Sequence, residues 1–324
     1  MKVVIGGASK ELGEAIANVL NVRPSPVQTS KFADGETNVA VTGDLFDQEV
    51  YVVQSTSSPV NDSLMEFLLM VDAIKRVGAK KITAVIPYYG YSRQDRVIKD
   101  NHMSSALSAK LVADMIGVDR VIVIDLHSSQ IEGFFNIPIT NLNCFEVFVE
   151  FLSQLVYGSG EQDTCTSIKK EDLAIVAPDI GAIGKARAFA KAMEARHDIE
   201  LSDKIVVVDK YREKAGVSQV MNIIGEVANK NCVIVDDLVD SGGTLCNAAS
   251  ALKDRGAKFV VACITHGVLS GNAVEKICSS ALDKLVITDT IFPKFTKTDK
   301  IEVVPIANVL ADFILKTQGD KNAL

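Results

Sequence analysis

Short runs of apolar, mostly β-branched residues recur along the chain and constrain its fold more than any other feature. They show little alternation of apolar and polar residues, which is typical of strands buried on both faces of a sheet. The runs lie at residues 3–5, 50–53, 82–86, 121–124, 173–176, 205–208, 232–235, 259–264 and 285–287. Helical patterns separate several of them. Alternating strands and helices predict an α/β fold with parallel sheets covered on both sides.

The clearest helical pattern covers residues 61–77. Its apolar residues recur at helical spacing, at Leu64, Phe67, Leu68, Val71 and Ile74. Ser63 and Glu66 have the spacing of a capping box, and Gly78 stands where a C-terminal glycine is expected.

The length of 324 residues suggests two domains. Residues 157–172 lose the apolar pattern and collect Gly, Ser, Thr and charge, which predicts a long surface loop near a domain junction. We expect domains at 1–146 and 147–324. Acids end two similar strand patterns, VIVID at Asp125 and VIVDD at Asp237, which hints at a duplicated domain.

Composition limits the partners and the compartment. The formal net charge is −7, so neither nucleic acid nor an anionic membrane has electrostatic support as a partner. The six cysteines include no CxxC pair, and the first ten residues do not form a signal peptide. No run approaches the ~18 apolar residues of a membrane span. We expect a cytoplasmic protein.

The turn GASKELG, residues 7–13, follows an apolar strand and precedes an amphipathic helix. It comes close to a dinucleotide-binding turn, but Glu11 replaces the middle glycine. None of the tyrosines begins the Tyr-x-x-x-Lys pair of short-chain dehydrogenases. We therefore interpret this segment as a plain strand-to-helix turn.

The strongest single motif is CVIVDDLVDSGGT, residues 232–244. Gly242 and Gly243 allow backbone N–H groups to converge on a phosphate, and the following helix adds its dipole. The hydroxyls of Ser241 and Thr244 are further donors. Because Asp236 and Asp237 would repel a phosphate, we expect them to bind sugar hydroxyls or a metal-bound diol.

This motif resembles the phosphoribosyl-diphosphate-binding loop of the type I phosphoribosyltransferase fold. Further segments widen the likeness: FADGE at 32–36, the stretch from Gln54 to Arg96, DLHSSQIEGFF at 125–135, APDIG at 177–181 and VSQVMNIIGEV at 217–227. Together, and in this order, they resemble the ribose-phosphate diphosphokinase (phosphoribosyl-pyrophosphate synthetase) family over most of residues 1–312. The resemblance implies two tandem type I phosphoribosyltransferase-like domains with mainly parallel sheets.

The resemblance also implies an activity and a cofactor. Such enzymes transfer the β,γ-diphosphoryl group of ATP to the 1-hydroxyl of ribose 5-phosphate, giving phosphoribosyl diphosphate and AMP for nucleotide, histidine and tryptophan biosynthesis. Holding two polyanions together requires Mg²⁺ and fixed cations. By resemblance His127 and Asp179 are ligands of the Mg²⁺. Taken alone, a single histidine is more often structural.

Further site residues follow from the same resemblance. Arg93 and Gln94 match the ATP-binding pair, and Phe32, Asp34, Gly35 and Glu36 match an adenine-contacting loop that reaches the site from a neighbouring subunit. Lys210 and Arg212 match the catalytic Lys-x-Arg of a mobile loop, where a solvated charged loop is the alternative. Arg212, Asp236, Asp237, Asp240, Ser241, Gly242, Gly243 and Thr244 form the expected ribose 5-phosphate site. The implied assembly is a hexamer.

Between Asp95 and Leu107 the chain departs from the family pattern. It lacks the second arginine and the proline of a regulatory phosphate and ADP site, and Lys99 or His102 could replace them only in part. Two alternatives stay open for the function. A phosphoribosyltransferase would share the 236–244 loop, and a regulatory homologue would bind the synthetase without catalysis.

Overall fold

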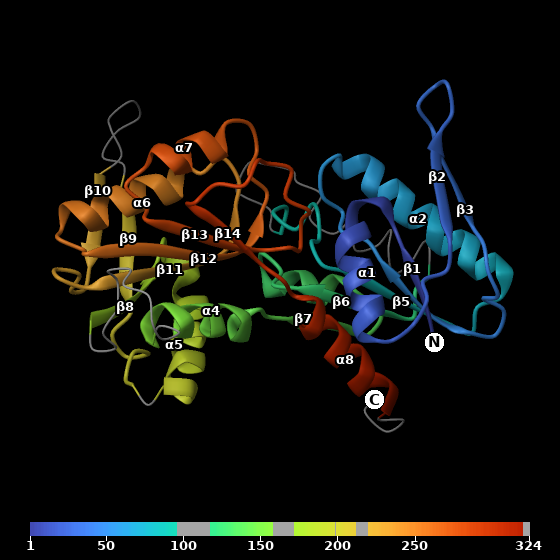
Figure 1. Ribbon diagram of the computed structural model, residues 1–324, viewed down its shortest axis with the longest axis horizontal. Coiled ribbons are helices and arrows are strands. Elements are labelled where there is room, and N and C mark those ends of the chain that lie inside the picture. Colours follow the sequence, from blue (N-terminus) through green and yellow to red (C-terminus); the bar gives the residue numbers. More distant parts are fainter. Residues whose placement is uncertain (96–116, 158–171, 198, 212–219, 320–324) are drawn as a thin grey trace. The chain divides into compact units, whose positions relative to one another are not determined.

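The computed structural model describes residues 1–95, 117–157, 172–197, 199–211 and 220–319. The chain forms two compact α/β units (Figure 1). The first comprises residues 1–144, 289–293 and 305–324, and the second comprises residues 145–288 and 294–304. Both units are discontinuous in sequence. After residue 288 the chain enters the first unit at 289–293, returns to the second at 294–304 and ends in the first. The domain limits of 1–146 and 147–324 remain a prediction.

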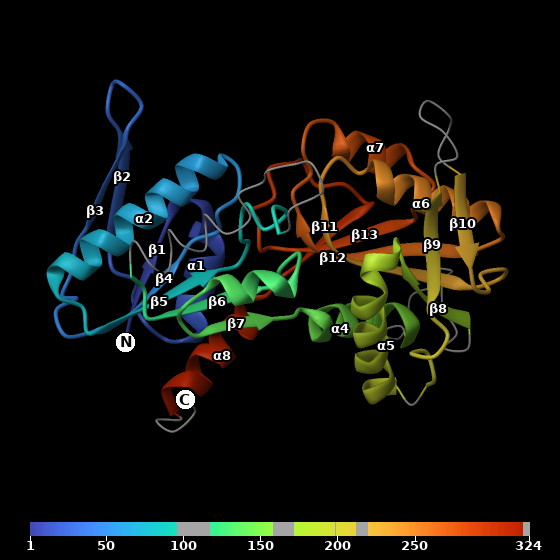
Figure 2. The ribbon, with the colours of Figure 1, turned by 180° about the vertical axis from the view of Figure 1, so that it is seen from behind.

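The first unit contains a sheet of five parallel strands. Its order is β1 (Lys2–Ile5), β4 (Glu49–Val53), β5 (Lys81–Ile86), β6 (Arg120–Ile124) and β7 (Ile139–Leu142). Helix α2 (Val60–Val77) covers one face, where Phe67, Met70 and Ile74 are fully buried against the strands (Figure 2). Helices α1 (Lys10–Val19) and α8 (Ala307–Gly319) contact each other.

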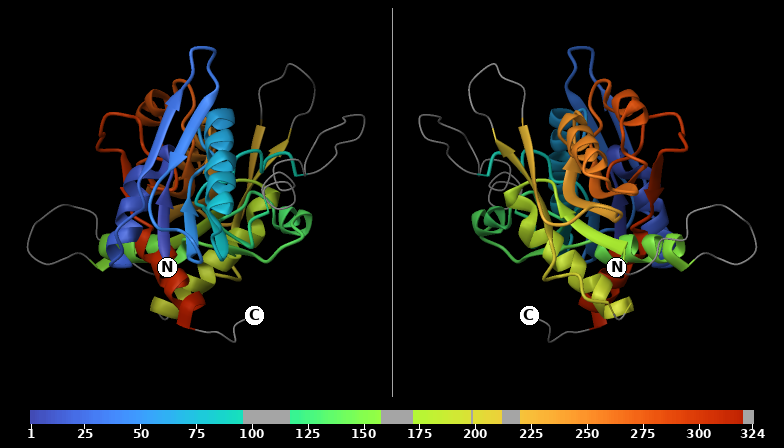
Figure 3. Two further views of the ribbon diagram at one scale, coloured as in Figure 1. Left: turned by 90° about the vertical axis from the view of Figure 1, so that its right-hand side faces the viewer. Right: turned by 90° about the vertical axis from the view of Figure 1, so that its left-hand side faces the viewer.

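A hairpin of β2 (Val27–Lys31) and β3 (Thr37–Val41) forms a separate two-stranded antiparallel sheet in the first unit. Strand β3 lies beside α2, as both views in Figure 3 show. Apolar side chains at the base of the hairpin, those of Val27, Val39 and Val41, pack against the core of the unit.

The second unit contains a seven-stranded sheet in which only β10 is antiparallel to its neighbour. The order is β10 (Val220–Ile224), β9 (Val206–Tyr211), β8 (Leu173–Ala177), β11 (Asn231–Val239), β12 (Phe259–Gly267), β13 (Lys284–Thr288) and β14 (Ile301–Val304). The helices are α4 (Phe145–Tyr157), α5 (Ile183–His197), α6 (Gly243–Asp254) and α7 (Ala273–Ser279).

Every strand expected from an apolar run is present, and the mainly parallel α/β architecture is confirmed. The helix expected at 61–77 begins at Val60, and Gly78 ends it with a left-handed φ of 88°. The prediction of a capping box formed by Ser63 and Glu66 was wrong. Pro59 is the N-cap without a side-chain hydrogen bond, and Ser63 and Glu66 are buried inside the helix. The loop expected at 157–172 falls largely on residues outside the described part.

The two units repeat one chain order. Each has a first strand, an antiparallel pair and four further parallel strands: β1, β2–β3 and β4 to β7 in the first, β8, β9–β10 and β11 to β14 in the second. In each main sheet the parallel neighbours follow the same sequence, β1-β4-β5-β6-β7 and β8-β11-β12-β13-β14. The topology thus supports a duplicated domain, but not through the acids that suggested it. Asp125 follows β6, which corresponds to β13, whereas Asp237 lies in β11, which corresponds to β4.

The described residues include no helix that is both long enough and apolar enough to cross a bilayer.

Candidate active site

In the second unit, several expected residues follow neighbouring parallel strands. Asp179 comes after β8, Lys210 is near the end of β9, and Asp236 and Asp237 are in the last part of β11. Strand β8 pairs with both β9 and β11 in parallel. Because parallel strands end at the same edge, these residues share the carboxyl edge of the sheet, where α/β proteins bind ligands.

The turn after β11 opens helix α6. Gly242 has a left-handed φ of 74° and is the N-cap, and no side chain of the described residues hydrogen-bonds at this cap. The first turn of α6 contains no acidic residue, so no carboxylate there competes with an anion for the backbone amides. Ser241 and Thr244 are exposed beside these amides. Asp240 binds the neighbouring loop, because its carbonyl accepts from the amide of Ser270 at 3.2 Å.

The pKa of Asp236, one of the two adjacent acids in β11, is strongly shifted. Burial, and next the charge of Asp237, raise the pKa of Asp236 to about 8. An Asp236 carboxylate oxygen accepts from the amide of Asp237 at 2.9 Å. The carboxylate of Asp237 is buried and lies 4.0 Å from the ammonium nitrogen of Lys185. Sequence reasoning missed Lys185, although it stands only six residues after Asp179 and at the start of α5.

Asp179 holds the turn that starts the next helix. Its Oδ1 accepts from the amide of Ala182 at 3.1 Å, and its carbonyl accepts from the same amide at 3.2 Å. The short 3-10 helix η5 (Ile180–Ala182) then leads into α5. The carboxylate is thus fixed at the sheet edge by a local cap.

Lys210 is described through its backbone, which pairs with Met221 across the β9–β10 hairpin. Arg212, the other expected catalytic residue, lies outside the described residues. The same holds for Lys99 and His102 in the segment that departs from the family pattern.

In the first unit, two expected residues follow adjacent parallel strands. Arg93 comes after β5 and His127 after β6, and both are exposed. Arg93 and Gln94 follow a turn in which the amide of Gln94 donates to the carbonyl of Tyr91 at 2.9 Å. His127 precedes the 3-10 helix η3 (Ser129–Phe134), which Ser128 caps.

The remaining expected residues form the tip of the β2–β3 hairpin. Phe32 accepts from the amide of Gly35 and donates to the carbonyl of Glu36, both at 2.9 Å. A carboxylate oxygen of Asp34 accepts from the amide of Glu36 at 3.1 Å. Gly35 has a φ of 95°, which favours glycine, and Phe32 is 56% exposed. The tip therefore presents an aromatic ring on an ordered turn.

The turn GASKELG joins β1 to α1, as expected of a strand-to-helix turn. Its amides are occupied by side chains of the same unit: Gly7 donates to Glu66 Oε1 at 3.0 Å, and Ala8 donates to Gln54 Oε1 at 3.1 Å. A Cβ atom at Gly6 would lie 2.3 Å from Gln54 Oε1. These side chains take the place that a ligand would need.

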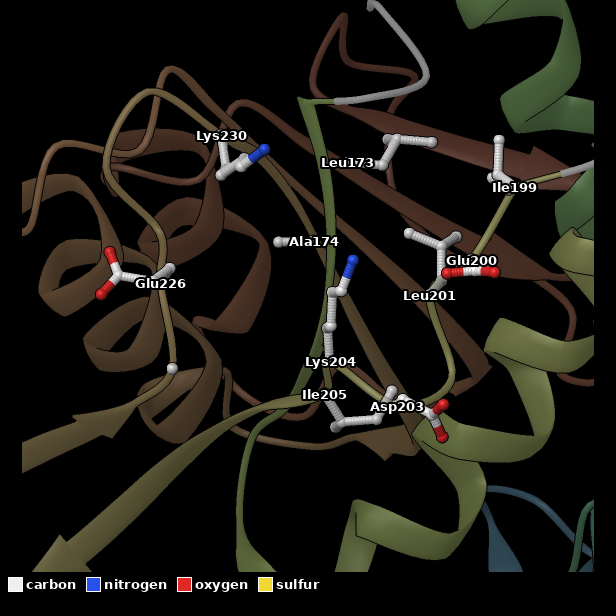
Figure 4. Close-up of a pocket in the computed structure, with 11 residues that line it drawn as sticks. Leu173, Ala174, Ile199, Glu200, Leu201, Asp203, Lys204, Ile205, Glu226 and Lys230 are labelled. Carbon is white, nitrogen blue, oxygen red and sulfur yellow. The ribbon is translucent and has the colours of Figure 1, made fainter.

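A pocket of about 970 Å³ lies elsewhere in the second unit (Figure 4). Its walls come from the beginnings of β8, β9 and β11 and from the end of the antiparallel β10. This is the amino edge of the sheet, opposite to Asp179 and Asp236. Lys204 and Lys230 are accompanied by Glu200, Asp203 and Glu226, so the walls carry mixed charge. The pocket is separate from the candidate active site.

Within the described residues, no three or more His, Cys, Asp or Glu side chains gather as a metal-binding group. His127 belongs to the first unit and Asp179 to the second. The oxygen donors of the Asp179 carboxylate suit Mg²⁺, which keeps several waters and needs only one or two protein carboxylates.

Comparisons with known proteins agree over almost the whole chain. Residues 1–118 match the N-terminal domain of ribose phosphate pyrophosphokinase, and residues 200–322 match the phosphoribosyl synthetase-associated domain. Ribose-phosphate pyrophosphokinases of Hyphomonas neptunium and Mesorhizobium japonicum are 44% and 45% identical over 327 aligned positions. In both cases the match covers 99% of this chain and 98% of the relative.

The fold agrees as well. The crystal structure of phosphoribosylpyrophosphate synthetase from Mycobacterium smegmatis has a TM-score of 0.86 and 30% identity, over 98% of this chain and 99% of that chain. The expected fold of two phosphoribosyltransferase-like domains is thereby confirmed. Family models, relatives and structure all lead to one conclusion: the chain belongs to the ribose-phosphate pyrophosphokinase family, and it is an enzyme of that kind.

Proposed function

We propose that this enzyme transfers the β,γ-diphosphoryl group of ATP to the 1-hydroxyl oxygen of ribose 5-phosphate. The new bond joins that oxygen to the β-phosphorus, and the bond from the β-phosphorus to the bridging α,β-oxygen breaks. AMP leaves with the bridging oxygen, and the hydroxyl proton is released. The observation that carries this proposal is the carboxyl edge of the second sheet, where a glycine turn without a side-chain cap follows the half-buried Asp236 and the buried Asp237.

Ribose 5-phosphate binds at the α6 turn in this proposal. The amides of Gly242, Gly243 and Thr244 and the hydroxyls of Ser241 and Thr244 hold its phosphate. Asp236 and Asp237 accept hydrogen bonds from the ribose hydroxyls, and Asp240 orders the turn. Arg212 gives a second cationic contact. The separation of phosphate donors from carboxylates along β11 and α6 supports this orientation of the sugar phosphate.

ATP is assigned to the first unit's motifs. The guanidinium of Arg93 offers planar donors to phosphate or stacks on adenine, and Gln94 contributes amide contacts. Phe32 stacks on the purine, while Asp34 and Glu36 accept from its amino group. The exposed ring of Phe32 and the ordered turn around Gly35 support the assignment.

Lys210 and Arg212 stabilise the diphosphoryl group during transfer, because fixed cations lower the energy of charge that develops on its oxygens. His127 and Asp179 would hold Mg²⁺. The ion would supply neutralisation of the phosphate charges. The carboxylate of Asp179, fixed by the amide of Ala182, supports this role.

We further propose that the enzyme is a cytoplasmic homo-oligomer, with a hexamer as the family precedent. An oligomer would allow the hairpin tip to reach the site of a neighbouring subunit. The net charge of −7 supports the absence of nucleic acid and membrane partners.

The decisive experiment follows the release of AMP from ATP and ribose 5-phosphate, with and without inorganic phosphate. We expect AMP and phosphoribosyl diphosphate in equal amounts, with activity lost when EDTA removes divalent metal. Formation of ADP would contradict diphosphoryl transfer. Retained binding of ribose 5-phosphate without turnover would favour the regulatory homologue. The phosphate arm tests whether the divergent 95–107 segment still supports activation.

A further inference from the structure

Side chains link the β2–β3 hairpin to the rest of the first unit beyond the residue pair Ser25–Val3, where the amide of Ser25 donates to the carbonyl of Val3 at 2.8 Å just before β2. Unlike the β9–β10 hairpin, which joins its main sheet through β8, it forms a sheet of its own. An isolated hairpin has little stability without packing against a further element. In this unit that element is α2, which lies beside the hairpin (Figure 3).

One face of β2 meets α2 through polar contacts. Strand residues two apart share a face, so Val27, Thr29 and Lys31 point the same way. Val27 packs against the core, the hydroxyl of Thr29 donates to Glu66 Oε1 at 2.8 Å, and Lys31 forms an ion pair with Asp62. The last residue of this face, Lys31, directly precedes Phe32.

The two contacts are spaced by about the same distance along β2 and along α2. Thr29 and Lys31 are two strand residues apart, or roughly 6.6 Å. Their partners Glu66 and Asp62 are four helix residues apart, or about 6 Å along the same helix face. The contacts therefore hold the strand antiparallel to the helix in one register.

Glu66 is itself held firmly. It is 8% exposed, and its carboxylate also accepts from the amide of Gly7 at 3.0 Å and from Gln54 Nε2 at 2.9 Å. Gln54 in turn accepts from Ala8. The hydroxyl of Thr29 is thus joined to a carboxylate that is anchored to the turn after β1 and to the end of β4.

We propose that Glu66, acting through Thr29, is a positioning residue for the loop Phe32–Glu36 and so sets the affinity for ATP. This inference rests on the proposed role of that loop in nucleotide binding. Glu66 contacts no substrate in this scheme. It fixes the strand that carries the loop, so the binding of ribose 5-phosphate is independent of it.

The test compares Thr29→Val with Thr29→Ser in the full-length enzyme. Valine keeps the shape and removes the donor, while serine keeps the donor. We expect Thr29→Val to raise KM for ATP about fivefold, as loss of one hydrogen bond allows, with kcat and the KM for ribose 5-phosphate unchanged. Thr29→Ser should restore KM for ATP. An equal response to valine and serine would overturn the inference.

Ser30→Ala is the matched control. Its hydroxyl lies on the other face of β2 and accepts from Asn38 within the hairpin at 3.3 Å. We expect its KM for ATP to stay within about twofold of the original. An increase equal to that of Thr29→Val would show general loosening of the hairpin and would contradict a specific role of Glu66.

Two further variants separate this inference from the proposed function. Glu66→Met removes the acceptor of the Thr29 hydroxyl and should raise KM for ATP like Thr29→Val, and if it does not fold, Thr29→Val alone carries the test. Phe32→Ala tests the loop itself. An unchanged KM for ATP in Phe32→Ala would refute the nucleotide role of the loop and with it the inference. A raised KM in Phe32→Ala with an unchanged KM in Thr29→Val would refute the positioning role alone.

Discussion

The two units agree at the amino edges of their sheets and differ at the carboxyl edges. Asp119, before β6, accepts from the amide of Ile82 at 2.7 Å, and Asp283, before β13, accepts from the amide of Val260 at 2.7 Å. The agreement extends to backbone bonds. Asp47 donates to Gly78 as Asn229 donates to Gly256, and Lys80 donates to Gln48 as Lys258 donates to Lys230. Asp47 and Asn229 also share a positive φ.

The carboxyl edges have diverged. After β4, the buried side chains of Ser55 and Thr56 are used inside the first unit: Ser55 donates to the carbonyl of Thr290 at 2.6 Å, and Thr56 accepts from the amide of Gly90 at 2.6 Å. Along the corresponding connection from β11 to α6, the side chains of Ser241 and Thr244 are exposed. The same chain order thus supports a closed hydrogen-bond network in one unit and an open turn in the other.

The amino edges therefore contribute to stability, and the carboxyl edge of the second unit is available for ligand binding. Repeated amino-edge contacts hold neighbouring strands together in both units, whereas the second carboxyl edge keeps donors that the fold does not use. Changes at matched positions should therefore have matched effects at the amino edges and different effects at the carboxyl edges.

The largest contrast in kcat is expected between the two hairpins. Lys210→Ala should lower kcat by about 10³, an effect of ~4 kcal/mol, because the transferred group loses a fixed cation. Lys31→Ala, in the corresponding first hairpin, should change kcat by less than about threefold, because its partner Asp62 is on the protein surface. Steady-state kinetics and calorimetry with ribose 5-phosphate measure both. A raised KM for ribose 5-phosphate with unchanged kcat would assign Lys210 to binding.

The next contrast compares the two carboxyl edges directly. Thr244→Ala and Asp240→Ala should weaken ribose 5-phosphate binding about tenfold, because the phosphate loses a donor or an ordered turn. Thr56→Ala should leave that affinity unchanged and lower the free energy of unfolding by ~1–3 kcal/mol, since the buried amide of Gly90 loses its acceptor. Calorimetry and denaturant titration distinguish the two outcomes. Unchanged affinity in both second-unit variants would exclude this loop as the phosphate site.

Most strands of the two main sheets could be predicted from the sequence, because buried parallel strands have a strong apolar signal. The separate hairpin could not, since β2 (VQTSK) has one apolar residue and is mostly exposed. The capping box failed for a related reason. Local spacing placed Glu66 near Ser63, but its partners are Gly7, Thr29 and Gln54, which are distant in sequence.

The candidate site was predicted in the same uneven way. Glycines and acids after a buried strand indicated the 236–244 turn directly, and the structure places them at the sheet edge. Lys185 gave no such signal, because a lysine in an amphipathic helix is ordinarily solvated. Only the pairing of β8 with β11 explains why the helix after β8 meets Asp237.

The amino edges should respond alike. Asp119→Ala and Asp283→Ala each remove the acceptor of a strand amide, so each should lower the free energy of unfolding by ~1–2 kcal/mol. The loss should be somewhat greater for Asp283, which also forms an ion pair with Lys253 at 2.6 Å. Neither variant should change KM or kcat. A kinetic effect in either one would show that the amino edge is coupled to catalysis and would break the division between the edges.

The smallest effect concerns the stability cost of the acidic pair. The pKa of Asp236 is raised to about 8, so the folded state retains a proton that the unfolded chain releases near pH 4. The free energy of unfolding therefore falls as pH rises between these values, because the unfolded state binds fewer protons than the folded state. Asp236→Asn cannot ionise and should avoid this loss.

We expect Asp236→Asn to be more stable than the original chain by about 1 kcal/mol above pH 8 and to weaken ribose 5-phosphate binding. The gain stays small because asparagine must still be buried and accepts more weakly from the amide of Asp237. Thermal unfolding at pH 6 and pH 9 measures the difference between the two proteins, which should grow with pH. If the difference in the free energy of unfolding between Asp236→Asn and the original chain does not change with pH, Lys185 keeps both Asp236 and Asp237 ionised. The stability cost of the exposed turn after β11 would then come from its glycines.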